Sequence, residues 1–458
     1  MNFIQDQSYL FSVALLLIVS TNSFTADQNI IDVDNRSQTY FNGNIWAVLV
    51  AGSNGWFNYR HQADVCHAYQ VLHRHGIPDE RIIVMMYDDI ANNSENPIPG
   101  FIRNKPHGPN VYPGVPKDYT GEDVTPENFL SALSGDEHLE ARGKKVVKSG
   151  PNDHIFIYFS DHGSDGLIAF PSSELLASQF NKVILKMHRQ RKYGKMVVYI
   201  EACESGSMFD GLLRKNINVF ATTASNSTES SYACYFDNEL QTYLGDVYSV
   251  KWLEDSDSRH SLRHETLQKQ FVIVKKETNT SHVQEFGDLR IGKLPVSQFQ
   301  GSKISEKIST SSVPITDAVR SEDVPLILAA RKMAKEKNET LKIIYRKKLD
   351  EILNLREFLK SSVRKIVKEI QPFVNASFDA LWNGKQKIKQ RECYELLYRV
   401  FDNRCFDLST HPYALRYLYV FVNFCNFSNG NASVVELARI TMTQFCAKHI
   451  IDTNKRIL

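Results

Sequence analysis

The sequence lacks a long hydrophobic run, an internal repeat and a strong net charge. Its longest mainly apolar stretch, Leu10 to Val19, is ten residues long, whereas a bilayer span needs about 20. The formal net charge is +2 over 458 residues. We therefore expect no membrane span in the mature protein, no nucleic-acid partner, and a chain long enough for two or three domains with a large core.

The apolar stretch at the N-terminus is too short for an anchor but has the length of a signal peptide. We predict a signal peptide over residues 1–23, although no Lys or Arg precedes the stretch, and a short polar segment over 24–44. Export also agrees with the glycosylation sequons, which we expect to be used in the secretory pathway. The acceptor residues are Asn35, Asn92, Asn226, Asn279, Asn375, Asn426 and Asn431, and Asn338 heads an eighth sequon.

Cysteine is scarce, and its distribution is uneven. Four of the seven cysteines, Cys393, Cys405, Cys425 and Cys446, lie in the last 66 residues. Such a cluster in a small exported domain predicts two disulfides, for which the sequence alone allows three pairings. The other three are Cys66, Cys203 and Cys234, so at least one thiol in the front part is free.

Alternating apolar strands and helical patterns predict a single α/β domain over residues 45–300. The expected strands are 45–51, 81–87, 154–159, 196–200 and 218–223, with a helix over about 172–191 and a long surface loop over 88–126. A Ser- and Thr-rich linker follows in the segment 301–338. Helical patterns begin before the end of this segment, at 325–371, and continue near 387–401, 412–424 and 432–449. The remainder, 339–458, is expected to be all-α.

The charge is divided between the two ends of the chain. Residues 325–458 carry 24 Lys and Arg against 13 Asp and Glu, a net of +11, which leaves 30 against 39, a net of −9, for residues 1–324. This division suggests two bodies that attract each other, although two separately solvated surfaces would show it equally well.

Two predicted neighbouring strands end in reactive side chains. One runs into Asp161-His162-Gly163, and the other runs into Glu201-Ala202-Cys203. A cysteine is nucleophilic as the thiolate and needs a base beside it, and His162 is the best-placed candidate. Backbone N–H groups at Gly163 and Cys203 could hold an oxyanion. A lone Cys or His is usually structural, but two such strand ends together favour a catalytic pair.

Several charged or polar residues flank the same predicted cleft. An amide side chain offers one acceptor oxygen and two N–H donors, so one guanidinium and two carboxylates would complement it. Such a pocket would favour a substrate asparagine, whereas the plainer interpretation is a scaffold of paired charges. The residues concerned are Arg60, His61, Glu201, Ser230 and Asp246.

Five sequence blocks closely resemble the legumains, the asparaginyl endopeptidases. They are the segments 51–56, 58–64, 161–164, 201–207 and 243–246, which read AGSNGW, NYRHQAD, DHGS, EACESGS and YLGD. The resemblance implies a caspase-like fold, a mostly parallel sheet flanked by helices, followed by a small all-α C-terminal prodomain. It implies Cys203 as nucleophile, His162 as acid/base and Asn58 as the group that orients the histidine. It also assigns the five pocket residues to specificity and makes Asp161 a position that can cyclise to a succinimide.

The resemblance extends to the tail, which becomes a prodomain that caps the active site until acid releases it. It implies the disulfides Cys393–Cys425 and Cys405–Cys446, leaves Cys66 and Cys234 reduced, and makes Asn338 the candidate site of self-cleavage. A glycan on Asn338 would make it a poor substrate for a pocket shaped to an unmodified amide. We therefore predict that Asn338 is unglycosylated and cleaved. We expect peptide substrates with asparagine before the scissile bond, the prodomain as inhibitor and possible cystatin-type inhibitors as further partners.

The expected activity is hydrolysis after asparagine, and more weakly after aspartate at acid pH, in a lysosomal compartment or after secretion. Two alternatives remain open: peptide ligation by the same site, and a secreted protein that uses the surface only for binding. A glycosylphosphatidylinositol transamidase subunit shares the fold but carries a membrane anchor. We expect no metal or organic cofactor, since no zinc-like ligand spacing occurs in the catalytic part.

Overall fold

The computed structural model describes residues 41–259, 261–304 and 313–450. All the elements described below lie in one compact unit, Asn42–Leu458. The predicted signal peptide and Asn35 lie outside the described residues. The boundaries that we predict between catalytic part, linker and prodomain stay predictions.

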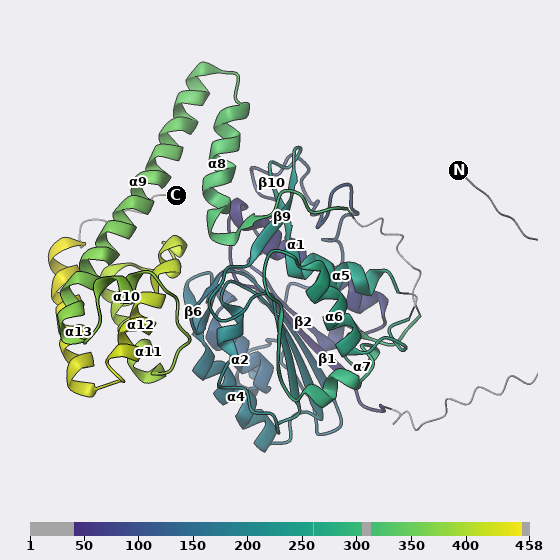
Figure 1. Cartoon of the computed structure of the whole chain (residues 1–458). Coiled ribbons are helices and arrows are strands. Elements are labelled where there is room, and N and C mark those ends of the chain that lie inside the picture. Colours follow the sequence, from purple (N-terminus) through teal and green to yellow (C-terminus); the bar gives the residue numbers. More distant parts are fainter. Residues whose placement is uncertain (1–40, 260, 305–312, 451–458) are drawn as a thin grey trace, which may run out of the picture. The chain divides into compact units, whose positions relative to one another are not determined.

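A six-stranded sheet forms the centre of the catalytic part (Figure 1). Five strands are parallel and β11 is antiparallel at one edge. The strands are rich in β-branched and aromatic residues and are buried on both faces, as parallel strands between helices must be. In spatial order they are β11 (Gln284–Gly287), β8 (Val219–Thr223), β7 (Lys195–Glu201), β3 (His154–Ser160), β1 (Ile45–Ala51) and β2 (Ile82–Met85).

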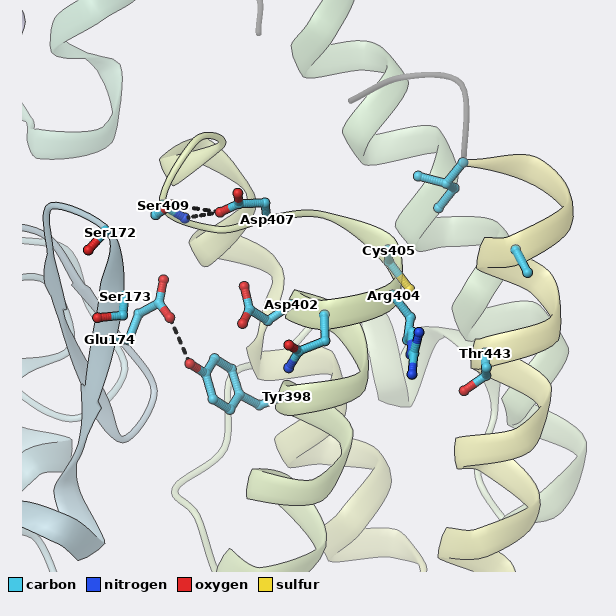
Figure 2. Close-up of a pocket in the computed structure, with 13 residues that line it drawn as sticks. Ser172, Ser173, Glu174, Tyr398, Asp402, Arg404, Cys405, Asp407, Ser409 and Thr443 are labelled. Atoms are coloured by element: carbon cyan, nitrogen blue, oxygen red, sulfur yellow. Dashed lines mark hydrogen bonds between the residues drawn. The ribbon is translucent and has the colours of Figure 1, made fainter. Parts of the chain in front are cut away.

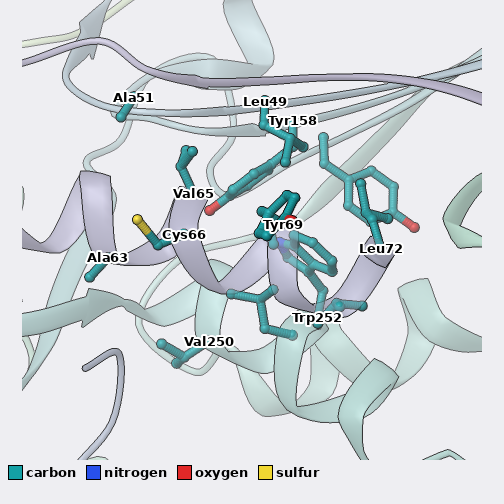
Figure 3. Close-up of a cluster of buried hydrophobic side chains, with 14 of the residues drawn as sticks. Leu49, Ala51, Ala63, Val65, Cys66, Tyr69, Leu72, Tyr158, Val250 and Trp252 are labelled. Atoms are coloured by element: carbon teal, nitrogen blue, oxygen red, sulfur yellow. The ribbon is translucent and has the colours of Figure 1, made fainter. Parts of the chain in front are cut away.

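Helices cover both faces of this sheet because alternate strand residues point to opposite sides. Leu49 and Ala51 join the core under one set of helices, and Val48 and Val50 join the core under the other. The first set is α1 (Tyr59–Arg74), α5 (Val247–Asp257), α6 (Leu267–Glu277) and α7 (Ser297–Gln300). The second is α2 (Pro126–Ser134), α3 (Glu137–Ala141) and α4 (Ala177–Arg189). Figure 3 shows Tyr158 of the sheet with Cys66 of α1 and Trp252 of α5 in the first core.

Two small antiparallel sheets lie beside the main one. The first is β10 (Thr242–Asp246), β9 (Tyr232–Asp237) and β12 (Val319–Arg320), and the second is β4 (Gly163–Ser164), β5 (Leu167–Phe170) and β6 (Ser173–Leu176). The helix expected over 172–191 was placed too early, since its first residues form β6. Leu175 of β6 pairs with Ile168 of β5, so backbone pairing with a neighbouring strand overrides the local helical pattern.

The C-terminal part is helical and carries two disulfides, Cys393–Cys425 and Cys405–Cys446. Its helices are α8 (Val324–Lys335), α9 (Glu339–Ile370), α10 (Phe378–Trp382), α11 (Arg391–Val400), α12 (Tyr419–Phe427) and α13 (Ala432–His449). The helical pattern expected over 325–371 is therefore two helices. The chain is extended at Asn338, whose side chain caps α9 by accepting a hydrogen bond from the Leu341 N–H at 3.1 Å.

The predicted fold class is confirmed: a mostly parallel sheet between helices is followed by a disulfide-bonded helical region. Cys66, Cys203 and Cys234 are free thiols. Within the described ranges, no helix combines the length and apolar character that a membrane crossing requires.

Candidate active site

Three central strands deliver the candidate catalytic residues to one edge of the sheet. Ala51 at the end of β1 is in register with Ser160 of β3, and Ser160 is in register with Glu201 of β7. Because these strands are parallel, the loops that leave their carboxyl ends meet at this edge. The loops carry Asn58, His162 and Cys203, in that order.

His162 is held by an amide oxygen. Its Nε2 lies 2.9 Å from Asn58 Oδ1, and since that oxygen can only accept, Nε2 carries the proton and Nδ1 is left as the acceptor. Burial lowers the pKa of His162 to about 3, although Asp161 acts in the opposite direction. A neutral imidazole with an available Nδ1 can take a proton from a thiol.

Cys203 is 6% exposed and accepts a hydrogen bond from the Ser231 backbone N–H at 3.3 Å. Burial raises the pKa of this thiol, and the neighbouring carboxylates of Glu322 and Glu204 raise it further. Gly163 packs directly against this turn, where an added Cβ would come within 2.5 Å of the Cys203 carbonyl oxygen. Only glycine therefore allows this close approach of the two strand ends.

A buried polar pocket lies beside this pair. Arg60 Nε donates to Asp246 Oδ1 at 2.9 Å, and His61 Nδ1 lies 2.7 Å from Asp161 Oδ1. Glu201 Oε2 accepts hydrogen bonds from the backbone N–H and the hydroxyl of one residue of α5, both at 2.9 Å. Four of the five predicted pocket residues are thus connected to one another or to the surrounding helices.

Two carboxylate oxygens of the predicted pocket residues accept no hydrogen bond from any described residue, although His61 Nε2 lies 3.6 Å from one of them, Asp246 Oδ2. Within the part of the chain that the structure describes, Glu201 Oε1 and Asp246 Oδ2 are buried and accept no hydrogen bond. Burial, and then the charge of Asp246, raises the pKa of Glu201. Buried acceptors without donors are uncommon in native proteins, so the two oxygens indicate a place where a ligand donates.

Residues 319–322 occupy the cleft, and we call them the blocking segment. Strand β12 pairs antiparallel with β9, with Arg320 opposite Tyr232. The Ser321 hydroxyl accepts from Arg60 Nη2 at 2.6 Å and lies 3.5 Å from His162 Nδ1. The chain therefore passes over the pocket with Ser321 placed at its guanidinium.

The next residue of the blocking segment, Glu322, covers Cys203, the candidate nucleophile. Its carboxylate accepts from the Ser230 hydroxyl at 2.9 and 3.0 Å, and its Oε2 lies 3.9 Å from Cys203 Sγ. The fifth predicted pocket residue, Ser230, thus contacts the blocking segment. Nothing in the local sequence around 321–322 marks these two residues, so sequence reasoning missed them.

The model of the peptidase C13 family matches residues 45–302. The chain belongs to the peptidase C13 family. A second model, that of the legumain prodomain, matches residues 347–446. The protein is thus a C13 cysteine endopeptidase that carries its own inhibitory prodomain.

Several C13 peptidases are similar over most of their length. Legumain of Rattus norvegicus is 48% identical over 413 residues, which is 89% of this chain and 93% of that one. Legumain of Homo sapiens is 50% identical over 389 residues, 84% and 89% of the two chains. The vacuolar-processing enzyme delta-isozyme of Arabidopsis thaliana is 43% identical over 445 residues, 92% and 94%. Among solved structures, caspase-1 from Spodoptera frugiperda matches at a TM-score of 0.32 and 8% identity, and covers 59% of this chain and 94% of its own.

The prodomain of this C13 peptidase contacts the catalytic part next to Cys203. Lys385 forms an ion pair with Glu204, and Ser164 Oγ donates to the Leu415 carbonyl oxygen at 2.7 Å. Burial raises the pKa of Glu204 to about 8 and that of Asp165 to about 6, while the Lys385 ammonium lowers both. Two buried carboxyl groups therefore share one cation, whose side chain is 28% exposed.

A second contact between prodomain and catalytic part surrounds a cavity of about 680 Å³. Figure 2 shows Glu174 of β6 receiving a hydrogen bond from the Tyr398 hydroxyl, at 2.7 Å, with Asp402 and Asp407 nearby. Burial raises the pKa of Glu174 to about 7, and the charge of Asp402 contributes to the shift. Carboxyl groups of the catalytic part and the prodomain thus lie close to one another here, whereas at Lys385 opposite charges pair.

The predicted glycan acceptors differ in their surroundings. Asn92, Asn279, Asn338, Asn375 and Asn431 are exposed, whereas Asn226 and Asn426 are half-buried. The Asn426 amide donates to Gln386 Oε1 at 3.1 Å and to the Lys387 carbonyl oxygen at 2.9 Å. A glycan on that nitrogen would remove one of these donors.

Proposed function

We propose that this C13 peptidase hydrolyses peptide bonds after asparagine, and more weakly after aspartate once acid neutralises the carboxylate. One observation carries the proposal: the pocket offers a guanidinium donor at Arg60 and two acceptors without donors, Glu201 Oε1 and Asp246 Oδ2. A carboxamide supplies the matching oxygen and the two N–H groups. An arginine or lysine side chain would instead place a cation beside Arg60.

In the proposed reaction, Cys203 attacks the carbonyl carbon of the asparagine residue and transfers its proton to His162. His162, held by Asn58, then protonates the leaving amine, and a thioester remains on Cys203. Water, deprotonated by the same imidazole, resolves the thioester and restores the thiol. The backbone N–H groups of Gly163 and Cys203 stabilise the oxyanion of each tetrahedral intermediate.

We also propose that acid releases the prodomain. The net charges of −9 and +11 attract each other at neutral pH, and acid removes negative charge from the catalytic part. At Lys385, the two facing carboxyl groups retain one proton near neutral pH, and further acidification protonates both. Lys385, whose side chain is 28% exposed, then loses both counter-charges, which weakens the attraction that holds the prodomain in place. An acidic endolysosomal compartment or the secretory route fits such an enzyme.

The proposed activating cut follows Asn338. This residue is exposed, and its backbone is extended between α8 and α9, with φ −78° and ψ 115°. A peptidase that binds substrates in extended form can reach such a residue more readily than an asparagine inside a helix. Intact-mass and peptide mapping of acid-treated protein should show a new C-terminus at Asn338 without a glycan. A glycan there with no cut would refute the assignment.

The specificity is tested with peptides that differ only at the residue before the scissile bond, assayed after acid activation. We expect turnover of the asparagine peptide to exceed that of an arginine peptide by at least about a hundredfold, because an arginine side chain would place a second cation beside Arg60. Cys203→Ala is the control for contaminating activity. Equal turnover of the two peptides would overturn the pocket assignment. If Cys203→Ala still lost all turnover, the assignment of Cys203 as nucleophile would stand.

A further inference from the structure

A small cavity lies between the blocking segment and the prodomain. Its volume is about 210 Å³. Arg320 and Glu322 of the blocking segment line one side, and Trp382, Lys385 and Arg416 of the prodomain line the other. The cavity is therefore complete only while the prodomain is docked over the active site.

The lining of this cavity has a surplus of positive charge. Three cationic side chains face one carboxylate, Glu322. Lys385 is already paired with Glu204, and Arg320 Nη1 lies 3.7 Å from Glu322 Oε1. Arg416 forms no ion pair with any other residue of the described ranges; its Nη1 donates to the Tyr413 hydroxyl, and its guanidinium lies over the Tyr413 ring at 4.7 Å.

The aromatic walls make these charges more effective. Trp382 and two tyrosines, Tyr417 and Tyr419, line the same cavity, and they exclude part of the water that would otherwise screen the cations. Guanidinium groups bind planar or tetrahedral oxyanions through paired N–H donors. A cavity of this size accommodates an inorganic oxyanion or a small carboxylate rather than a peptide.

We propose that this cavity binds a small oxyanion, such as sulfate, phosphate or a small polycarboxylate, and that the bound anion holds the prodomain on the catalytic part. The proposal depends on the proposed function in one respect: the enzyme is inhibited while the prodomain is docked. The anion joins Arg320 of the blocking segment to Arg416 of the prodomain. Since the undocked protein has only one of the two walls, the anion binds the docked state preferentially.

The size of the effect follows from mass action. A ligand that binds only the docked state, present at ten times its dissociation constant, lowers the undocked fraction about elevenfold. Acid activation, which requires undocking, should slow by a similar factor. Sodium chloride should act in the opposite direction, because screening weakens the attraction between the two oppositely charged bodies.

Binding is measured first on the full-length Cys203→Ala proenzyme, which cannot cut itself. Isothermal titration with sulfate, phosphate and citrate in separate arms should give saturable binding at one site, and the ranking of the arms identifies the preferred oxyanion. Arg416→Gln should weaken binding at least about tenfold, as expected for loss of one charge-assisted contact. Arg320→Gln is a second variant, since that side chain is 52% exposed and its replacement should not disturb folding.

The matched control is Arg346→Gln, which removes an exposed cation of α9 that does not line the cavity. This variant should bind sulfate as the parent protein does. Absence of saturable binding, or equal binding by Arg416→Gln and the parent, would overturn the proposal. A merely non-specific salting effect of sulfate would appear equally in all variants and would not saturate.

The consequence for activation is measured on proenzyme with an intact Cys203. Low millimolar sulfate should slow the appearance of cut protein at acid pH relative to sodium chloride of equal ionic strength, and Arg416→Gln should lose this difference. Equal rates in the two salts would refute the regulatory part. The titration on Cys203→Ala does not depend on catalysis or on asparagine specificity. Its result therefore tests anion binding even if the proposed function is wrong.

Discussion

The carboxylate of Glu322 should keep the catalytic thiol protonated in the proenzyme. Its Oε2 lies 3.9 Å from Cys203 Sγ, and its side chain is 13% exposed. Two unit charges about 4 Å apart interact by ~1 kcal/mol in water and ~4 kcal/mol at the effective dielectric constant of a protein surface. Since one pKa unit corresponds to about 1.4 kcal/mol, Glu322→Gln should lower the pKa of Cys203 by about one to three units.

The change is isosteric, so it removes the charge without opening the cleft. The Gln carbonyl oxygen can still accept from the Ser230 hydroxyl. The assay is the rate of alkylation by iodoacetamide as a function of pH, with full-length Cys203→Ala as the measure of background from Cys66 and Cys234, which are both buried. At a fixed pH below the pKa, Glu322→Gln should react about tenfold faster or more. An alkylation profile that moves by less than about a third of a pH unit would refute the reasoning.

Two further outcomes test the blocking segment and the like-charge contact of the prodomain. Ser321→Asn supplies the amide that the pocket lacks, so the blocking segment should become a substrate, and peptide sequencing should detect a new N-terminus at Glu322. A Ser321→Ala protein should remain uncut. Absence of the cut in Ser321→Asn would contradict the pocket assignment. Glu174 has a pKa raised from 4.5 to about 7 while docked, so its charge opposes docking above pH 7 and ceases to do so as pH falls through this range. Glu174→Gln in a Cys203→Ala background should therefore strengthen docking by up to ~3 kcal/mol at pH 8 and leave it unchanged near pH 4, as measured by urea titration of prodomain release; an equal effect at both pH values would show that charge is not the cause.

The edge of the sheet that carries the candidate site could be predicted from the sequence, because each strand that ends there is a contiguous pattern in the sequence. The runs before His162 and Cys203 are continuous, apolar and bounded by glycine, and parallel strands bring their carboxyl ends together whatever the rest of the chain does. The pairing of the four tail cysteines was open from spacing alone. It followed only from the family resemblance, and the structure has the same pairing.

Other features depend on partners that are distant in sequence. Ser230 and Glu322 are 92 residues apart, so no local pattern could show that a polar turn would cover the nucleophile. The strand Ser173–Leu176 was expected to be helical, because its pairing with β5 is a tertiary effect. The break at Asn338 was missed because the apolar spacing continues on both sides of it, although an asparagine followed by a glutamate is a typical helix start.

The pairing of β12 with β9 has a consequence for the kind of protein that this peptidase degrades. When the blocking segment leaves, β9 is an edge strand with unpaired backbone groups, and a substrate must supply a strand of its own to satisfy them. Under the proposed specificity, asparagines inside helices, such as Asn423 in α12, cannot do so until the helix unfolds. The folding stability of a substrate, as much as its sequence, therefore decides whether it is cut. Under the proposed acid release, the acid that frees the enzyme also unfolds many of the proteins presented to it.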